Sequence, residues 1–179
     1  MNMKFNFMLG MLLFSFFLPS CDKVDELTHF TMKQETETTI PSTLHVNVPI
    51  NVWTPSIASN STKTFESNNT HKNLIEEIIL TNLELTISTE GASWDFMKSI
   101  EIYISADGVQ ETKIAWLYDI PQTGLKKLKL ETSKDDLKAY IKMDYYKLRT
   151  KTVTRQIISK DINVKINSSF YVDAKILGI

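Results

Sequence analysis

Apolar and polar residues alternate one by one along several short segments of this chain, and this pattern constrains its fold more than any other feature. In residues 44–52 every even position is apolar and every odd position is not, and residues 83–87 and 100–104 repeat the alternation. Because successive side chains of a β-strand point to opposite faces of a sheet, each segment predicts a strand with one buried face. Further strands are predicted at residues 113–118, 128–130, 146–153, 162–166 and 170–176.

About eight short strands with polar faces predict an all-β fold, in which two antiparallel sheets pack as an immunoglobulin-like or related sandwich. Pro49 has no N–H group to donate, so the strand at residues 44–52 is expected at a sheet edge, or bulged or broken there. Residues 162–176 keep one parity and form either one long bent strand or two strands that meet near residues 167–169. Cys21 is the only cysteine, so no disulfide within the chain stabilises the fold.

One or two short helices are expected to interrupt the strands. Ser133 can cap a helix whose first turn holds Asp135 and Asp136, where carboxylates complement the helix dipole. Three apolar residues would then share one helix face: Leu137, Tyr140 and Ile141. Residues 70–78 form either a turn of helix or an extension of the strand that follows.

The N-terminal segment has the features of a signal peptide. Lys4 precedes an apolar run at residues 5–18, whereas a membrane-spanning helix needs about 20 residues. The run closes on the tetrapeptide Leu-Pro-Ser-Cys, which ends at Cys21. This tetrapeptide resembles the lipobox of bacterial lipoproteins. Residues 1–20 are therefore predicted to be a lipoprotein signal peptide.

The resemblance implies that Cys21 becomes the first residue of the mature protein and carries its membrane anchor. In that family a diacylglyceryl group joins the cysteine sulfur, and a fatty acyl chain such as palmitate joins the freed amine. Each buried methylene contributes about 0.8 kcal/mol, so one chain anchors marginally and three chains hold the protein at the membrane.

A charged cluster of Asp22, Lys23, Asp25 and Glu26 follows the cysteine. It resembles the surface-export signal of lipoproteins from Bacteroidota-type bacteria, which implies a location on the outer face of the outer membrane. The alternatives are an ordinary charged tether or exposure to the periplasm. A third alternative is retention at the inner membrane, which an Asp directly after the cysteine favours in lipoproteins of enteric bacteria.

Residues 21–39 have little apolar content and many charges, so they are expected to form the lipidated N-terminus and a flexible tether. Residues 40–179 then form one β-sandwich domain, which can bury roughly two-thirds of its unfolded surface. The chain resembles small Bacteroidota-type lipoproteins of unassigned function in its acidic start, two of its strands and residues 113–116. None of these is a site motif, so the resemblance implies no catalytic or binding residues.

The chain has no motif of a catalytic, metal or cofactor site. His29, His45 and His71 lack metal-ligand spacing, and no Gly-x-Ser-x-Gly sequence is present. The five glycines form no phosphate-binding loop, and the formal net charge of −1 gives no reason to expect nucleic acid as a partner. We therefore expect no catalytic residue, no metal and no cofactor.

Trp94 and Asp95 are the best candidates for contact with a glycan. They lie in the loop at residues 91–96, loops at one end of a sandwich commonly bind ligands, and an exposed tryptophan beside polar groups can stack on a sugar ring. The alternative is that Trp94 and Phe96 close the end of the sandwich. Trp116 has the inward parity of its strand and is expected in the core.

A basic stretch supplies the other candidate contacts: Lys147, Arg149, Lys151 and Arg155. Alternation places these residues on one strand face, which would suit an anionic partner. The alternative is a solvated face whose cations pair across the sheet with residues such as Glu84 or Glu101.

Together these features predict a lipid-anchored protein of the cell envelope that acts as a non-catalytic binding or structural module. Its expected partners are the membrane, through the lipid, and a glycan or an envelope protein. Two rival functions remain: a small glycan-active hydrolase whose carboxylates come from distant strands, and a periplasm-facing accessory subunit of an outer-membrane complex.

Overall fold

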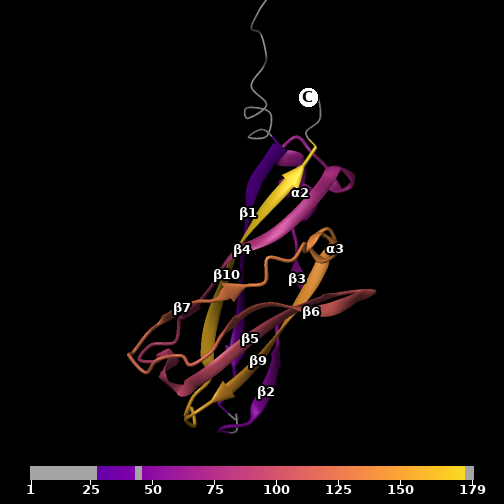
Figure 1. The fold of residues 1–179 in the computed structure, drawn as a ribbon. Helices are drawn as coiled ribbons and strands as arrows, with labels where there is room; N and C mark the ends of the chain where they lie inside the picture. The colour runs from indigo at the N-terminus through magenta and orange to yellow at the C-terminus, as the bar shows by residue number, and fades with distance from the viewer. Residues whose placement is uncertain (1–27, 43–45, 176–179) are drawn as a thin grey trace, which may run out of the picture.

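The computed structural model describes residues 28–42 and 46–175, which form two antiparallel sheets packed face to face (Figure 1). This arrangement confirms the predicted all-β sandwich. The four-stranded sheet has the order β1 (His29–Ile40), β10 (Ile162–Ala174), β4 (Ile75–Ile87) and β7 (Lys127–Lys129).

The six-stranded sheet has the order β2 (Pro49–Trp53), β9 (Tyr145–Thr154), β5 (Met97–Ala106), β6 (Val109–Leu117) and β8 (Glu131–Thr132), and β3 (Ile57–Ala58) also pairs with β9. The helices among the described residues are α2 (Ser61–Ser67), α3 (Lys138–Ile141) and two 3₁₀ turns, Lys72–Leu74 and Trp94–Phe96.

The core lies between the sheets and follows the alternation of the sequence. In β10 every even residue from Ile162 to Ala174 is buried, and in β9 every even residue from Tyr146 to Thr154 is buried. The apolar side chains of one parity therefore meet across the sandwich, and the opposite parity is left for the two outer faces.

The predicted tether is wrong over most of its length, because His29–Ile40 forms strand β1. β1 pairs with β10 along its whole length, and Met32 and Ile40 are buried. The intervening inward positions carry Gln34, Thr36 and Thr38. A partly buried edge strand tolerates such polar residues, so the segment has little apolar content although it alternates.

The remaining strand predictions have clear outcomes. Residues 162–174 form one strand with a register shift between Ser169 and Phe170, which is the single bent strand of the two alternatives. Pro49 is the first residue of β2, an edge strand, as its missing N–H group predicted. Residues 72–78 contain both a 3₁₀ turn and the start of β4.

The predicted helix near Ser133 begins later than expected. Ser133 Oγ accepts from the Asp135 N–H group but does not cap a helix, because Lys134 has a φ of 65° and turns the chain. α3 spans only Lys138–Ile141, and the expected apolar residues Leu137, Tyr140 and Ile141 are buried. α2 was not predicted, since its sequence STKTFES has only one apolar residue.

Candidate functional site

The outward side of the six-stranded sheet carries two rows of side chains that cross it from strand to strand. The first row consists of Trp53, Arg149, Tyr103 and Lys113. The second row consists of Asn51, Lys151, Glu101, Trp116 and Glu131. We call these residues the outer face. Directly opposed residues of neighbouring strands lie close enough for their side chains to interact.

Arg149 is at the centre of the first row. Its guanidinium donates to both carboxylate oxygens of Glu111, at 2.5 and 2.8 Å, and to Asn51 Oδ1 at 2.6 Å. The same group lies 4.1 Å from the ring centroid of Tyr103 and 5.8 Å from that of Trp53. A planar guanidinium in a two-bond pair is held in one orientation, and it orients the rings around it. Its bonds with the Glu111 carboxyl lower the pKa of that group.

Glu101 organises the second row. Its oxygens accept hydrogen bonds from Tyr118 Oη at 2.7 Å and from Tyr103 Oη at 3.1 Å. The ammonium groups of Lys113 and Lys151 each lie 3.3 Å from one of its oxygens. Burial alone would raise the pKa of Glu101, but these four partners outweigh burial and lower the pKa from 4.5 to about 2. Glu101 is therefore ionised at any physiological pH.

Trp116 belongs to this outer face, so its predicted place in the core is wrong. Its Nε1 donates to Glu131 at 2.8 Å, and Lys113 Nζ lies 5.2 Å from its ring centroid. The register of β5 and β6 shifts opposite Ile114, and both Ile114 and Ala115 are buried. One extra residue in a strand reverses the parity of those that follow, which turns Trp116 outward.

A hollow of about 350 Å³ lies at the margin of the outer face, where β1 approaches β2. Its lining consists of Glu37, Thr38, Thr39, Trp53, Pro55 and Asn163, and we call it the Trp53 hollow. Trp53 belongs to both the outer face and the hollow, and it is 51% exposed. Ligand pockets span about 300–1,000 Å³, so the hollow is large enough for a small ligand.

The prediction that Trp94 contacts a glycan is wrong, because its side chain is 0% exposed. The ring stacks on Phe96 with 6.0 Å between centroids, and its Nε1 donates to the Lys126 carbonyl oxygen at 3.1 Å. The alternative, in which Trp94 and Phe96 close the end of the sandwich, is confirmed. A short loop at residues 91–93 carries the chain inward, and a buried indole needs only one acceptor.

Asp95 is half-buried and lies beside a different hollow. Its Oδ1 accepts from the Gly124 N–H group at 2.9 Å. It lines a hollow of about 290 Å³ with Phe96, Lys160 and Ile157, the last of which is highly exposed. The structure therefore separates Asp95 from Trp94, which turns inward.

Within the basic stretch, two residues form ion pairs across the sheet: Arg149 pairs with Glu111, and Lys151 pairs with Glu101. The alternative of cross-strand ion pairs is confirmed for Glu101, which contacts Lys151. Glu84 instead pairs with Lys127 at 3.0 Å in the other sheet. A paired face does not present the run of unpaired charges that an anionic partner would require.

The other two basic residues lie apart from this pairing. Arg155 follows the end of β9 and donates from Nη2 to the Ile120 carbonyl oxygen at 2.8 Å. Lys147 is exposed at the opposite end of β9, across from Ser105. The four residues therefore share a strand but do not form one site.

The sequence analysis named Glu101 as a cross-strand partner but missed Tyr103 and Trp53 of the outer face, and Glu111 beside it. Tyr103 occupies the polar parity of a predicted strand, and Glu111 and Trp53 lie in segments where no motif stands out. The available signal was that three predicted strands carry aromatic or charged residues on the parity that faces solvent. Which of these residues meet depends on strand order, which sequence periodicity does not contain.

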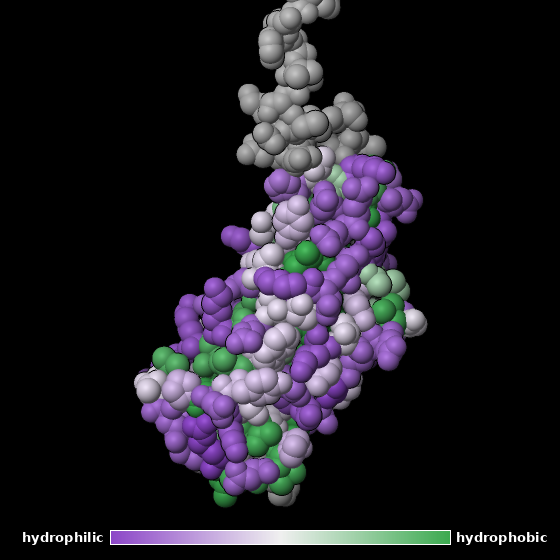
Figure 2. Space-filling model, in the orientation of Figure 1, coloured by the Kyte–Doolittle hydropathy of each residue, from purple (hydrophilic) through white to green (hydrophobic). Residues whose placement is uncertain are grey.

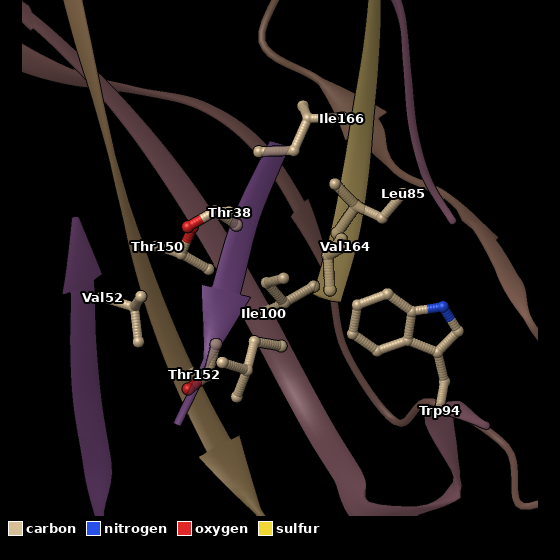
Figure 3. A pocket seen from close by; sticks show the side chains of 10 residues that line it. Thr38, Val52, Leu85, Trp94, Ile100, Thr150, Thr152, Val164 and Ile166 are labelled. Atoms are coloured by element: carbon tan, nitrogen blue, oxygen red, sulfur yellow. The ribbon is translucent and has the colours of Figure 1, made fainter. Parts of the chain in front are cut away.

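An interior cavity between the sheets is too small for a ligand. Figure 3 shows its lining, with Trp94 on one side and Thr150 and Thr152 of β9 on another. Its volume of about 10 Å³ is at the lower limit for a single water molecule. Thr152 Oγ1 is buried there and has no hydrogen-bond partner among the described residues.

The described residues contain no helix long and apolar enough to cross a membrane. In the same part of the chain, no group of three or more His, Cys, Asp or Glu side chains could hold a metal ion. The predicted lipidation site and export signal lie outside the described residues: Cys21, Asp22, Lys23, Asp25 and Glu26.

Comparison with known proteins finds no matching family model. No curated protein matches the sequence. Among solved structures, the chain is similar to one from Desmodium yellow mottle tymovirus, with 12% identity, a TM-score of 0.32, and coverage of 84% of this chain and 91% of that chain. A turnip yellow mosaic virus structure has 11% identity, a TM-score of 0.28, and coverage of 84% and 96%. TM-scores this low support no conclusion about function.

Proposed function

We propose that this protein is a lipid-anchored module of the outer membrane, exposed at the cell surface, that binds a ligand without catalysis. The observation that carries the proposal is the outer face, where aromatic rings and paired charges cross five strands in register. The lipobox at Cys21 and the charged cluster after it support the anchor and the location.

The ion pairs of the outer face order its side chains in addition to stabilising the fold. The Arg149 guanidinium, paired with Glu111, lies between the rings of Tyr103 and Trp53. A surface whose side chains are already ordered loses little entropy when a ligand binds, and this favours affinity.

The attachment of the chain would place the end of the sandwich that holds the Trp53 hollow away from the membrane. Cys21 and His29 are eight residues apart, a span of at most about 28 Å. β1 starts at the end of the sandwich where β10 finishes, and β2 lies toward the opposite end (Figure 1). The Trp53 hollow is about 30 Å along β1 from His29. An anchored domain would therefore present this end to large ligands outside the membrane.

The electrostatics of the face favour binding over hydrolysis. A glycoside hydrolase needs one carboxyl group with a raised pKa to act as a general acid. Within the described residues, each carboxyl group with a shifted pKa has it lowered: Glu101, Glu111, Asp136 and Asp161. Ionised carboxylates cannot donate a proton, but they can accept hydrogen bonds from the donor groups of a bound ligand.

The surface of the module also favours a polar ligand over an obligate protein subunit. Figure 2 shows that hydrophobic residues on the visible side stand in small groups separated by hydrophilic ones. Interfaces that hold permanent subunits together present larger contiguous apolar areas.

Protease shaving of intact cells, with a periplasmic protein as the leakage control, tests the location. We expect the native chain to be removed and to incorporate labelled palmitate. The variant Cys21→Ser should incorporate no label and remain at precursor size. Normal processing of this variant, or full protection of the native chain, would contradict the proposed anchor or its surface exposure respectively.

A further inference from the structure

We propose that the Trp53 hollow binds one neutral sugar unit of a glycan. This inference rests on the proposed binding function and deepens it by naming the ligand class. The hollow combines an exposed aromatic ring with hydroxyl, amide and carboxylate groups in a space of about 350 Å³. Such a combination matches the two kinds of surface that a pyranose ring presents, a C–H face and a rim of hydroxyls.

The ring of Trp53 supplies the apolar contact. It is 51% exposed although it lies in a strand, and Pro55 lines the same hollow. The Arg149 guanidinium, which Glu111 and Asn51 hold in place, lies 5.8 Å from the centroid of the indole ring. An indole is a rigid group with a large flat area, and it loses little rotamer freedom on binding.

The polar groups of the hollow supply both donors and acceptors. Thr39 Oγ1 donates to Asn163 Oδ1 at 3.0 Å, which directs the Nδ2 donor of Asn163 elsewhere. The Glu37 carboxylate can only accept. Neighbouring hydroxyls of one sugar can donate to Glu37 and accept from Asn163, because each hydroxyl does both.

The charge of the hollow selects against acidic glycans. Among the described residues, its lining contains one carboxylate, Glu37, and no lysine or arginine. Lys165 lies 3.6 Å from Glu37 and 3.3 Å from Glu35, so two carboxylates share one cation. A uronate or a sulfated sugar would bring another negative charge to this place, whereas a neutral hexose would not.

The test is calorimetric titration of the full-length chain in detergent micelles. The probes are neutral hexasaccharides of β-1,4-linked glucose, mannose and xylose, with hexagalacturonate and hexalysine as charged probes. At least one neutral probe is expected to bind, and hexagalacturonate to bind at least tenfold more weakly. Trp53→Ala should weaken neutral binding at least tenfold, and Thr39→Val severalfold, with melting temperatures close to that of the native chain.

Tyr145→Ala is the matched control, because Tyr145 is another exposed aromatic residue in the same sheet but lies outside the hollow. It should bind like the native chain. The inference is overturned if no neutral probe binds, if a charged probe binds best, or if Trp53→Ala binds normally. If Trp116→Ala loses binding and Trp53→Ala does not, the hollow is not the sugar site. The outer face would then remain the binding surface.

Discussion

Two tryptophans of this chain show how surroundings decide the role of a residue. Trp94 lies in a loop, where either contact with a glycan or closure of the sandwich was expected, and it is completely buried. Trp53 lies in a strand, yet half of its surface is exposed. The loop at Trp94 ends in a 3₁₀ turn that points the ring between the sheets, while the parity of β2 directs Trp53 outward.

The two residues should respond differently to removal of the ring. Trp94→Ala leaves a large cavity and should reduce the free energy of unfolding by about 3–5 kcal/mol, which lowers the melting temperature by roughly 10 °C. Trp53→Ala removes a half-exposed ring and should change the free energy of unfolding by less than about 1 kcal/mol. Calorimetric melting of both variants checks this, and equal losses would contradict the assigned environments.

Thr152 carries a buried hydroxyl without a partner among the described residues. An unpaired buried polar group destabilises a fold by about 1–3 kcal/mol, and an apolar group of the same shape removes that penalty. Thr152→Val should therefore leave the free energy of unfolding unchanged or raise it by up to about 1 kcal/mol. Urea denaturation measures this change, and Thr150→Val is the matched control on the same strand. A large loss in Thr152→Val would show that the hydroxyl has a partner, such as a bound water.

Strand β1 is a segment of low apolar content that forms an ordered element because it pairs with a neighbouring strand. Its residues resemble a polar tether because half of its inward positions carry Gln or Thr. As an edge strand it needs only a partly apolar face, and its backbone bonds to β10 give it order. Charged side chains on its outward positions, such as Lys33 and Glu35, protect such an edge from pairing with other chains.

Truncation separates a strand from a tether. A chain that starts at residue 29 should melt cooperatively, close to the temperature of the mature protein. A chain that starts at residue 41 should lose cooperative melting, because β10 loses its partner strand and the core surface that Met32 and Ile40 cover becomes exposed. Circular dichroism of both chains tests this. Native-like melting of the shorter chain would show that residues 29–40 act as a tether and are not required for the fold.

The whole molecule is expected to lose stability in acid, because several carboxyl groups are more acidic when folded. The pKa of Glu101 is lowered to about 2, and the pKa values of Glu111 and Asp136 are also lowered. A depressed folded-state pKa contributes stability that is complete above the unfolded pKa, near 4.5, and is lost as pH falls toward 2.

Glu101→Gln should flatten this dependence. The variant should lose roughly 1–2 kcal/mol of unfolding free energy at pH 7, since the four partners of Glu101 keep only a neutral acceptor. Between pH 4.5 and pH 2 its stability should fall less steeply than that of the native chain. Urea titrations across this range check the slope, with Glu84→Gln as the control on the other sheet. Parallel slopes would show that Glu101 is not the group responsible.

The sequence by itself determined the class of fold and most of the core. Side-chain parity is a local property, so the alternation in residues 83–87 and 100–104 identified buried faces without any knowledge of neighbours. The signal-like segment before Cys21 is equally local, and it supports a proposal about the anchor. Parity failed where the chain departs from regular pairing, as at the shift beside Ile114 that turned Trp116 outward.

Only the tertiary structure decided which residues stand together. Trp53, Arg149 and Tyr103 come from three strands that are distant in sequence, and the strand order β2-β9-β5 makes them neighbours. The pairing of β6 with β5 placed Glu111 within reach of Arg149, and the packing of the four-stranded sheet against the six-stranded one brought Glu37 of β1 beside Trp53. Contacts between distant segments depend on how sheets assemble. Periodicity within a segment does not contain that information, so the candidate site emerged only from the fold.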